Sequence, residues 1–377
     1  MSNKRMVPEV RFKGFVDSWA KNTLGNSCSI TTGKLDANAM RENGEYDFFT
    51  CSQEKFKINN WAFQGPAITV VGNGASVGFT HIAEGKFNAY QRTYVLNDFN
   101  DSYHQFLINC INNNLPAIIE EESRTGNIPY IVKDMLKQLT FYSCSNNEQY
   151  KIGEFFKNID ILITQTSNKL DKLKDVKKSL LNKMFPAEGK YVPEIRFKGF
   201  DENWAWFNVL ETCNVVTGGE APKDSFKGEK PFKEYKYPIF SNGLGNNSLW
   251  GWSKTFQIKA PAVTFSSIGS LGFPELRNQN FTPIIRLKVI TPKISNLNVC
   301  FLKYSLDLAE FSINSAGIPS VNSEFIKSIN FISSVNLDEQ SKIAEFLTAV
   351  DKLITLTNKK LNKLKDIKKA LLQKMFV

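Results

Sequence analysis

The sequence predicts two mixed α/β domains in tandem, each followed by a long helix, with the two helices paired in opposite directions as a coiled coil. Three observations support this fold class: a short sequence repeat, a long sequence repeat, and the helical spacing of apolar residues within the long one. The 377 residues suit two to three domains, and a hydrophobic fraction of 42% is enough to form cores.

Two sequence blocks each occur twice. The short block reads Val-Pro-Glu-[Val/Ile]-Arg-Phe-Lys-Gly-Phe and, extended to a tryptophan, has nine identical residues in thirteen at an offset of 185. The long block has 24 identical residues in 38 at an offset of 191. Because the two offsets are nearly equal, the chain consists of two units in tandem. The short repeat lies at residues 7–15 and 192–200, extending to Trp19 and Trp204, and the long repeat lies at residues 148–185 and 339–376.

The long repeat has the residue spacing of a helix. Apolar or small residues recur in steps of three and four, which gives one apolar stripe that needs a partner. A helix of about 34 residues is roughly 50 Å long. Two matching stripes predict that the helices pair with each other, antiparallel and with a pseudo-two-fold axis; the alternative is that they pack on the globular domains or on other subunits. The expected pairing residues are Ile152, Phe156, Ile159, Ile163, Leu170, Leu173, Val176 and Leu180 in the first copy, and Ile343, Leu347, Val350, Ile354, Leu361, Leu364, Ile367 and Leu371 in the second.

Between the repeats the two halves diverge, and only short similarities remain, such as Gly78-Phe79 and Gly272-Phe273. We interpret this as one backbone that carries two different surfaces. Short runs of β-type residues alternate with helical segments and with turns rich in Gly and Asn, which predicts mixed α/β domains. Strands are expected at residues 67–71, 93–96, 262–266 and 284–290, and short helices at 102–112, 131–137 and 299–311.

The predicted organisation has five parts and no membrane segment. The sequence contains no run of 18 uncharged apolar residues and its first twelve residues are polar, so we expect a cytoplasmic protein. The parts are a first domain at residues 1–147, a first helical spacer at 148–185, a linker at 186–191, a second domain at 192–335 and a second helical spacer at 336–377.

The net charge of +10 supports a nucleic-acid partner only modestly. The two copies of the long repeat carry +3 and +5 of it, so the rest of the chain is near neutral. Any DNA-binding face on the domains must therefore be a local patch.

Catalytic and metal-binding motifs are absent from the sequence. The six cysteines are scattered, without a CxxC pair, and are expected to be buried thiols rather than metal ligands or disulfides. The only histidines, His81 and His104, lack the spacing of a hydrolase triad or an HExxH site. The segments Gly72-Asn73-Gly74 and Gly243-Leu244-Gly245 do not complete a nucleotide-binding loop and are expected to be turns.

The order of these blocks resembles the specificity subunits of bacterial type I restriction-modification systems, in which a variable target-recognition domain and a conserved helical region alternate twice. The resemblance covers the whole chain and is carried by the short repeat and by the helix end Leu-Leu-[Asn/Gln]-Lys-Met-Phe at residues 180–185 and 371–376. It implies a non-catalytic subunit that reads the two halves of a split target in double-stranded DNA, with the helices fixing the gap.

The resemblance also implies partners. Two methyltransferase subunits would dock on this scaffold, and restriction subunits with motor activity would join them. S-adenosylmethionine, ATP and Mg would be used by those partners, while this chain itself would need no cofactor and no metal.

Candidate DNA-reading residues are those whose side chains match base edges: Arg or Lys for guanine, and Asn or Gln for adenine. We expect them in polar, Gly-flanked loops, although the same Asn and Gly residues could simply shape turns. A run of lysines could hold phosphates, or could be a solvated loop. The candidates are Lys34, Asn73, His81, Gln91, Arg92, Arg124 and Asn127 in the first domain, Lys223, Asn242, Asn246, Ser266, Ser267, Arg277 and Asn314 in the second, and the run Lys227, Lys230, Lys233 and Lys236.

Two other functions compete with this interpretation. A stand-alone bipartite DNA-binding regulator would explain two different domains, but gives no reason for two near-identical helices. A methyltransferase fused to its own reader would need donor-binding and Asn-Pro-Pro-aromatic motifs, which the sequence lacks.

Overall fold

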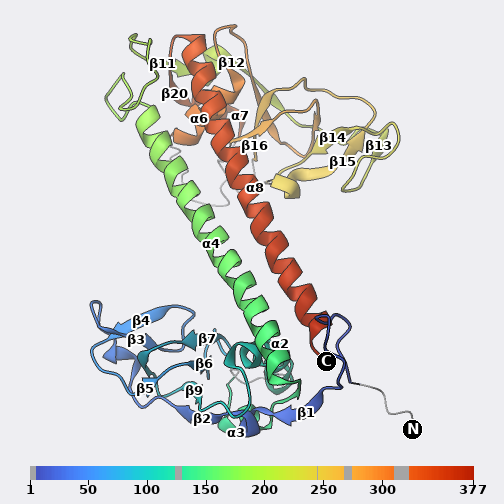
Figure 1. Cartoon of the computed structure of the whole chain (residues 1–377). Coiled ribbons are helices and arrows are strands. Elements are labelled where there is room, and N and C mark those ends of the chain that lie inside the picture. Colours follow the sequence, from blue (N-terminus) through green and yellow to red (C-terminus); the bar gives the residue numbers. More distant parts are fainter. Residues whose placement is uncertain (1–5, 124–129, 244, 267–273, 310–321) are drawn as a thin grey trace. The chain divides into compact units, whose positions relative to one another are not determined.

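The computed structural model describes residues 6–123, 130–243, 245–266, 274–309 and 322–377, and its contacts divide the chain into two units. The first unit comprises Met1–Asn168 together with Lys359–Val377, and the second comprises Lys169–Asn358. Each unit therefore contains one α/β domain and a part of each of the two longest helices (Figure 1). Within the described ranges, no helix combines the length and the apolar character needed to cross a membrane.

The first unit is built on two four-stranded sheets. One has the order β2-β9-β6-β7 and the other β4-β3-β8-β5, in which only β3 and β8 run parallel. The strands are β2 (Ser29–Thr32), β3 (Tyr46–Phe49), β4 (Lys55–Ile58), β5 (Phe63–Gln64), β6 (Ala67–Val71), β7 (Thr80–Ala83), β8 (Lys86–Ala89) and β9 (Thr93–Asn97). The pair β1 (Ala20–Thr23) and β10 (Thr140–Ser143), and the helices α1 (Leu24–Ser27), η1 (Ala37–Ala39), α2 (His104–Ser123) and α3 (Lys133–Gln138), complete the domain.

Strand β6 shows why this sequence forms a central strand. All five of its residues are buried, and successive side chains of a strand point to opposite faces. Ile68 and Val70 belong to the larger apolar cluster of the unit, while Ala67 belongs to a second cluster with Phe87 and Val95. A continuous apolar run is what a strand covered on both faces requires.

The second unit repeats the first sheet and the three central strands of the second sheet with different side chains, but its short edge strand β13 pairs with β15, whereas β5 of the first unit pairs with β8. Its sheets have the orders β12-β19-β16-β17 and β13-β15-β14-β18, with β14 and β18 parallel as β3 and β8 are. The predicted fold class, two tandem mixed α/β domains with a long helix after each, is confirmed. The strands are β11 (Ala205–Asn208), β12 (Cys213–Thr217), β13 (Ser225–Phe226), β14 (Tyr237–Phe240), β15 (Leu249–Ser253), β16 (Ala262–Phe265), β17 (Pro274–Arg277), β18 (Thr282–Pro283), β19 (Lys288–Pro292) and β20 (Asn330–Ser333), and the short helices are α5 (Val209–Thr212), η2 (Gly245–Ser248), α6 (Val299–Leu308) and α7 (Ser323–Ser328).

The long helices α4 (Asn146–Met184) and α8 (Leu337–Met375) have 39 residues each and run antiparallel within each unit. In the first unit, Phe156 near the start of α4 shares a core with Met375 at the end of α8, and one turn further along α4, Asp160 pairs with Lys368 at 2.6 Å. In the second unit, Met184 clusters with Ile343, and Lys177 pairs with Asp351 at 2.6 Å. Asp160 and Asp351, and likewise Lys177 and Lys368, are equivalent in the long repeat, so the same ion pair forms once in each unit.

Two positions of the predicted apolar stripe differ from the expectation. Val176 is 50% exposed and its equivalent Ile367 is 40% exposed. An apolar repeat of 3.5 residues drifts around a helix of 3.6 residues per turn, so not every stripe position faces the partner. The next residues, Lys177 and Lys368, make the ion pairs with the partner helix instead.

The short repeat joins the ends of the long helices. In the first unit, the Arg11 guanidinium donates to both carboxylate oxygens of Glu148 at 2.7 and 2.8 Å, near the start of α4. The Val10 N–H donates to the Lys374 carbonyl at 2.9 Å, near the end of α8. The ring of Trp19 packs edge-on against Phe376. One short segment therefore fixes two helix ends.

The second unit builds the same junction from the second copy. Arg196 donates to Glu339 at 2.6 and 2.9 Å, near the start of α8, and the Ile195 N–H donates to the Lys183 carbonyl at 2.8 Å, near the end of α4. Trp204 packs edge-on against Phe185. The Arg, Glu, Trp and Phe residues that make these side-chain contacts are thus identical in the two copies, whereas Val10 and Ile195 make the equivalent contact through the backbone.

Of the predicted short elements, the strand at 67–71 has the expected bounds, four others differ by one to three residues at an end, and two differ by more. Helix α2 continues beyond the expected end at residue 112 to Ser123, because Ile118 and Ile119 beyond Pro116 pack on the core and hold the helix across the proline. The expected strand at 284–290 is replaced by a turn at 284–287 followed by β19, since Ile285 and Arg286 adopt positive φ values of 50° and 60°.

Arg196→Ala should lower the free energy of unfolding by about 3 kcal/mol, because the Glu339 side chain is 0% exposed and would be left as an unpaired buried charge. The measurement is urea unfolding of the full chain. Lys183→Ala is the control: its pair with Glu194 is exposed, so the loss should stay below about 1 kcal/mol. Equal losses in the two variants would contradict this assignment.

Candidate functional site

A cleft of about 450 Å³ in the first unit brings three of the predicted reading residues together. Asn73 follows β6, while Gln91 and Arg92 precede β9, and these two strands are neighbours in the sheet. The Gly72 N–H donates to the Arg92 carbonyl at 2.9 Å, which fixes the two loops side by side. The cleft is lined by Gly72, Asn73, Gln91, Arg92, Tyr94, Tyr130 and Ile131.

The side chains of this cleft include two amides and a guanidinium group, of which the Asn73 amide is held by a hydrogen bond. Gln91 and Arg92 are exposed, whereas the Asn73 Oδ1 accepts a hydrogen bond from the Cys51 thiol at 2.8 Å. Burial raises the pKa of Cys51, so the thiol keeps the proton that it donates at neutral pH. Tyr130, 56% exposed, adds an aromatic ring at the rim. Amide and guanidinium groups are the groups that match the hydrogen-bonding edges of bases.

Lys34 lies beside the same cleft. It is exposed and follows β2, and the carbonyl of the next residue, Leu35, accepts a hydrogen bond from the Gln91 N–H at 2.9 Å. Its ammonium group therefore adds positive charge next to the turn that carries Gln91 and Arg92.

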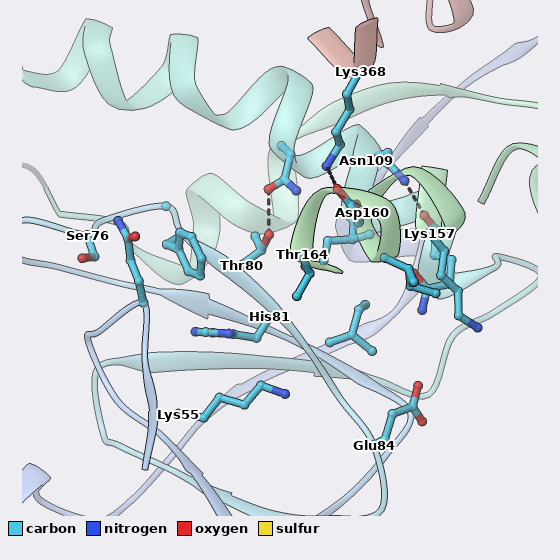
Figure 2. A pocket seen from close by; sticks show the side chains of 18 of the residues that line it. Lys55, Ser76, Thr80, His81, Glu84, Asn109, Lys157, Asp160, Thr164 and Lys368 are labelled. Atoms are coloured by element: carbon cyan, nitrogen blue, oxygen red, sulfur yellow. Dashed lines mark hydrogen bonds and ion pairs between the residues drawn. The ribbon is translucent and has the colours of Figure 1, made fainter. Parts of the chain in front are cut away.

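His81 lies elsewhere, in a larger cleft of about 1030 Å³ between the domain and the helices of the first unit (Figure 2). The expectation of an exposed loop is wrong here, because His81 is on β7 and half-buried, with its ring near Phe49 and Phe79. Burial lowers the pKa of His81, so the ring is neutral at pH 7. It offers a hydrogen bond but no charge.

The charges of this larger cleft are balanced within the unit. Lys368 points toward Asp160 (Figure 2), at 2.6 Å. Lys157 pairs with Glu154 at 3.3 Å, and Lys55 with Asp47 at 3.9 Å. Lysines that already face carboxylates attract an anionic ligand less, so the smaller cleft is the better candidate for reading bases.

In the second unit, Ser266 and Asn242 are less exposed than expected. Ser266 is only 2% exposed, directly after β16, because it continues the buried strand. Asn242 is half-buried, and its amide donates to the Ile285 carbonyl at 2.5 Å. Lys223 is exposed in the loop before β13. The backbone of Asn246 lies in η2, and Ser267, Asn314, Arg124 and Asn127 lie outside the described residues.

Arg277 is the clearest correction. It lies on β17 rather than in a loop, is 8% exposed, and donates to Thr264 Oγ1 at 3.0 Å and Ser248 Oγ at 3.1 Å. It also pairs with Glu275 and lies 4.1 Å from the Phe240 ring centroid. Burial lowers its pKa, and the carboxylate of Glu275 opposes that effect. This guanidinium holds two sheets together.

The lysine run between β13 and β14 forms an exposed basic surface with aromatic residues. Lys227 lies 5.8 Å from the Trp250 ring centroid, and Lys233 lies 5.1 Å from that of Phe232, which is 50% exposed. Lysines and exposed rings are suited to phosphate and sugar contacts, which position a protein on DNA without reading its sequence. The four lysines Lys227, Lys230, Lys233 and Lys236 are all exposed.

Among the described residues, no three or more His, Cys, Asp or Glu side chains are grouped as ligands of a metal ion. The two clefts combine apolar side chains with amides, hydroxyls and cations, and the larger one also contains the carboxylates of Glu84 and Asp160.

Comparison with known proteins agrees with this arrangement. A family model described as the type I restriction modification DNA specificity domain matches residues 17–175 and again residues 201–366. The chain belongs to this family. It is thus a DNA-specificity component of the type I restriction-modification class, and such components are not catalytic.

The relatives in this family are distant in sequence. The type I restriction enzyme EcoDI specificity subunit of Escherichia coli is 29% identical over 231 residues, which are 55% of this chain and 51% of that protein. The chain thus spans about half the length of that relative. The type I specificity subunit S.MpnORF507P of Mycoplasma pneumoniae is 26% identical over 81% of this chain and 77% of its own length. The crystal structure of the type I S subunit from M. genitalium shares the fold, with a TM-score of 0.77 over 99% of both chains at 18% identity.

One exposed arginine that is equivalent to Arg92 was not among the predicted reading residues. Arg286 lies in the turn before β19, as Arg92 lies in the turn before β9. The sequence contains a signal that could have identified Arg286. The offset of 194 residues between Gly78-Phe79 and Gly272-Phe273 also relates Arg92 to Arg286.

Arg277→Ala should lower the free energy of unfolding by about 3 kcal/mol, because it removes a buried cation and leaves Glu275 and the Thr264 hydroxyl without that donor. Urea unfolding of the full chain measures this. Lys259→Ala, which removes one exposed cation from the same domain, should change the value by no more than about 0.5 kcal/mol. An Arg277→Ala protein of unchanged stability would show that the guanidinium has no structural role.

Proposed function

We propose that the chain is the sequence-specific DNA-binding subunit of a type I restriction-modification complex, which recognises a bipartite, asymmetric target with a gap of fixed length. The observation that supports this proposal is the presence of two different surfaces on one repeated backbone. Membership of the family supports specificity for DNA. The presence of two similar domains supports a DNA target that is divided into two halves. The first recognition domain would be residues 1–147 and the second residues 192–335.

The difference between the two surfaces is the reason to expect an asymmetric target. At the end of β6 the first domain presents Asn73, with Gln91 and Arg92 beside it. The second domain has Asn242 packed against the Ile285 carbonyl and a basic aromatic loop that the first domain does not repeat. Two domains with unlike side chains read unlike sequences, because each base pair in the major groove has its own pattern of donors and acceptors.

The long helices are the proposed spacer. Each has 39 residues and is therefore about 58 Å long at 1.5 Å per residue. One turn of DNA is about 34–36 Å long, so a spacer of this length covers between one and two turns. Within each unit, antiparallel pairing and the buried junction hold the ends of the two helices, which supports a role as a spacer.

The partners follow from the family rather than from the described contacts. Methyltransferase subunits and restriction subunits would assemble on this chain, and the S-adenosylmethionine, ATP and Mg of the complex would be bound by those partners. Co-purification of the full chain with methyltransferase subunits tests this part. A homogeneous DNA binder that is active alone would favour a regulator instead.

Replacing residues 205–335 by the corresponding domain of another family member should change only one half of the methylated sequence. The two domains form separate cores, so a change in one leaves the reading surface of the other intact. Methylation mapping of DNA from cells that express the subunit with its partners gives the readout. The matched exchange of residues 20–147 should change the other half, and a change of both halves in either chimaera would refute modular reading.

Inserting seven residues into both helices, after Asn168 and after Lys359, should abolish methylation of the original target. The two sites are equivalent in the long repeat, so a heptad is added to each helix, lengthening it by about 10 Å. That length corresponds to about three base pairs at 3.4 Å each. Seven residues added to the linker at 186–191 are the control and should leave the target unchanged. An unaltered gap in the helix-insertion protein would rule out the spacer role.

A further inference from the structure

The two domains carry equivalent turns before the strands β9 and β19. In the first domain the Thr93 N–H donates to the Tyr90 carbonyl at 2.8 Å, and in the second the Leu287 N–H donates to the Ile284 carbonyl at 3.1 Å. Both are four-residue turns closed by the same hydrogen bond. They place Gln91-Arg92 and Ile285-Arg286 at the two central positions.

The surrounding backbone holds the two turns in the same way. The Tyr90 N–H donates to the Phe49 carbonyl at 2.9 Å, as the Ile284 N–H donates to that of Phe240 at 2.8 Å. On the other side, the Gln91 N–H donates to the Leu35 carbonyl at 2.9 Å, as the Ile285 N–H donates to that of Gly219 at 2.8 Å. Arg92 and Arg286 therefore occupy equivalent positions in the same set of hydrogen bonds, although Ile285 and Arg286 have positive φ and Gln91 and Arg92 do not.

The side chains at the turn tips are exposed in both domains. Arg92 and Arg286 are exposed, as is Gln91, and Ile285 is 53% exposed although it is a large apolar residue. In the first domain this turn lines the cleft that Asn73 also lines. The guanidinium position is common to the two domains, and the residue before it differs.

The second turn is held in an unfavourable conformation. Ile285 has φ of 50° and Arg286 has φ of 60°, a region that β-branched residues rarely adopt and that Gly and Asn favour in such turns. The Asn242 amide, which donates to the Ile285 carbonyl, helps to hold it. Strained backbone of this kind persists where the surroundings fix it, and it gathers at binding and catalytic sites.

We propose that these turns are the equivalent base-reading tips of the two domains, with Arg92 and Arg286 each reading a guanine and the preceding residue reading the adjacent base. This rests on the proposed function. Arginine matches guanine O6 and N7 with two hydrogen bonds, glutamine matches adenine N6 and N7, and an apolar side chain contacts the thymine methyl group. Gln91 thus selects adenine and Ile285 selects thymine.

The geometry of a turn tip suits adjacent base pairs. Neighbouring Cα atoms are 3.8 Å apart, close to the 3.4 Å rise of a base pair, so two successive side chains reach two successive base edges. The same frame in both domains gives both half-targets a guanine contact, and the variable neighbour makes the half-targets different.

The test uses the full chain in complex with its methyltransferase partners and selects bound duplexes from a pool with both half-targets randomised. Arg286→Ala should lose the preference for guanine at one position of one half-target, by about tenfold or more. Arg92→Ala should do the same in the other half. Lys293→Ala is the matched control, since it removes one exposed cation at the far end of β19 and should leave the selected sequence unchanged.

A second pair of variants keeps both arginines. Ile285→Gln should change the adjacent position from thymine to adenine in its half-target, and Gln91→Ile should make the opposite change in the other half. These variants preserve the charge and the backbone contacts of the turn, so loss of folding would not account for a changed preference.

Three outcomes would overturn the proposal. Arg286→Ala could weaken all sequences equally without altering the selected target, which is the behaviour of a phosphate contact. The variants of both turns could alter the same half-target. A wild-type complex that selects one undivided sequence would contradict the proposed function itself, and the turn assignment with it.

Discussion

The ion pair between the short repeat and the start of each long helix is the contact on which the rest of the structure depends. Glu148 is 1% exposed and Glu339 is 0% exposed, and a buried carboxylate is tolerated only where cations and donors surround it. Arg11 and Arg196 supply them in bidentate geometry, and the first turn of a helix is itself favourable for an acid. Each helix therefore begins at a fixed point against the short repeat, and the same segment binds the end of the other helix through its backbone. The antiparallel direction within each unit follows from these two attachments.

The distribution of identical and divergent residues follows from the kinds of contact they make. The junctions use side chains, so Trp19 and Trp204, or Phe376 and Phe185, are the same residue in both copies. The domains are aligned by backbone hydrogen bonds, which place no demand on side-chain identity. At equivalent positions of neighbouring strands, Ala83 pairs with Ala67 whereas Arg277 pairs with Ala262. The same sheet can thus accommodate a small apolar residue in one domain and a buried, ion-paired guanidinium in the other.

The sequence predicted those features that depend on periodicity and repetition. The tandem organisation, the long helices and the strand at residues 67–71 all follow from patterns along the chain. Sequence reasoning failed where one residue's environment is set by distant neighbours. A polar, Gly-flanked context suggested a loop around Arg277, but the partners that bury it are Thr264, Ser248 and Glu275. The apolar run at 284–290 suggested a strand, yet two residues of positive φ divide it. Of the candidate site, the grouping of Asn73, Gln91 and Arg92 required knowing that β6 and β9 are adjacent, which no local pattern reveals.

The backbone hydrogen bonds around each exposed turn also explain how DNA recognition can change without loss of folding. The turn that carries Gln91 and Arg92 is held by hydrogen bonds from the Gly72, Gln91 and Thr93 N–H groups, none of which involves a side chain of the tip. Substitution at an exposed tip costs little stability, since surface changes away from special features stay within about 0.5 kcal/mol. Substitution in the junctions costs much more stability, because removing one partner of a buried ion pair costs about 3–5 kcal/mol. Under these unequal constraints, the residues of the junctions stay the same while the exposed turns of the domains vary. This is the pattern of identity and divergence seen between the two repeats.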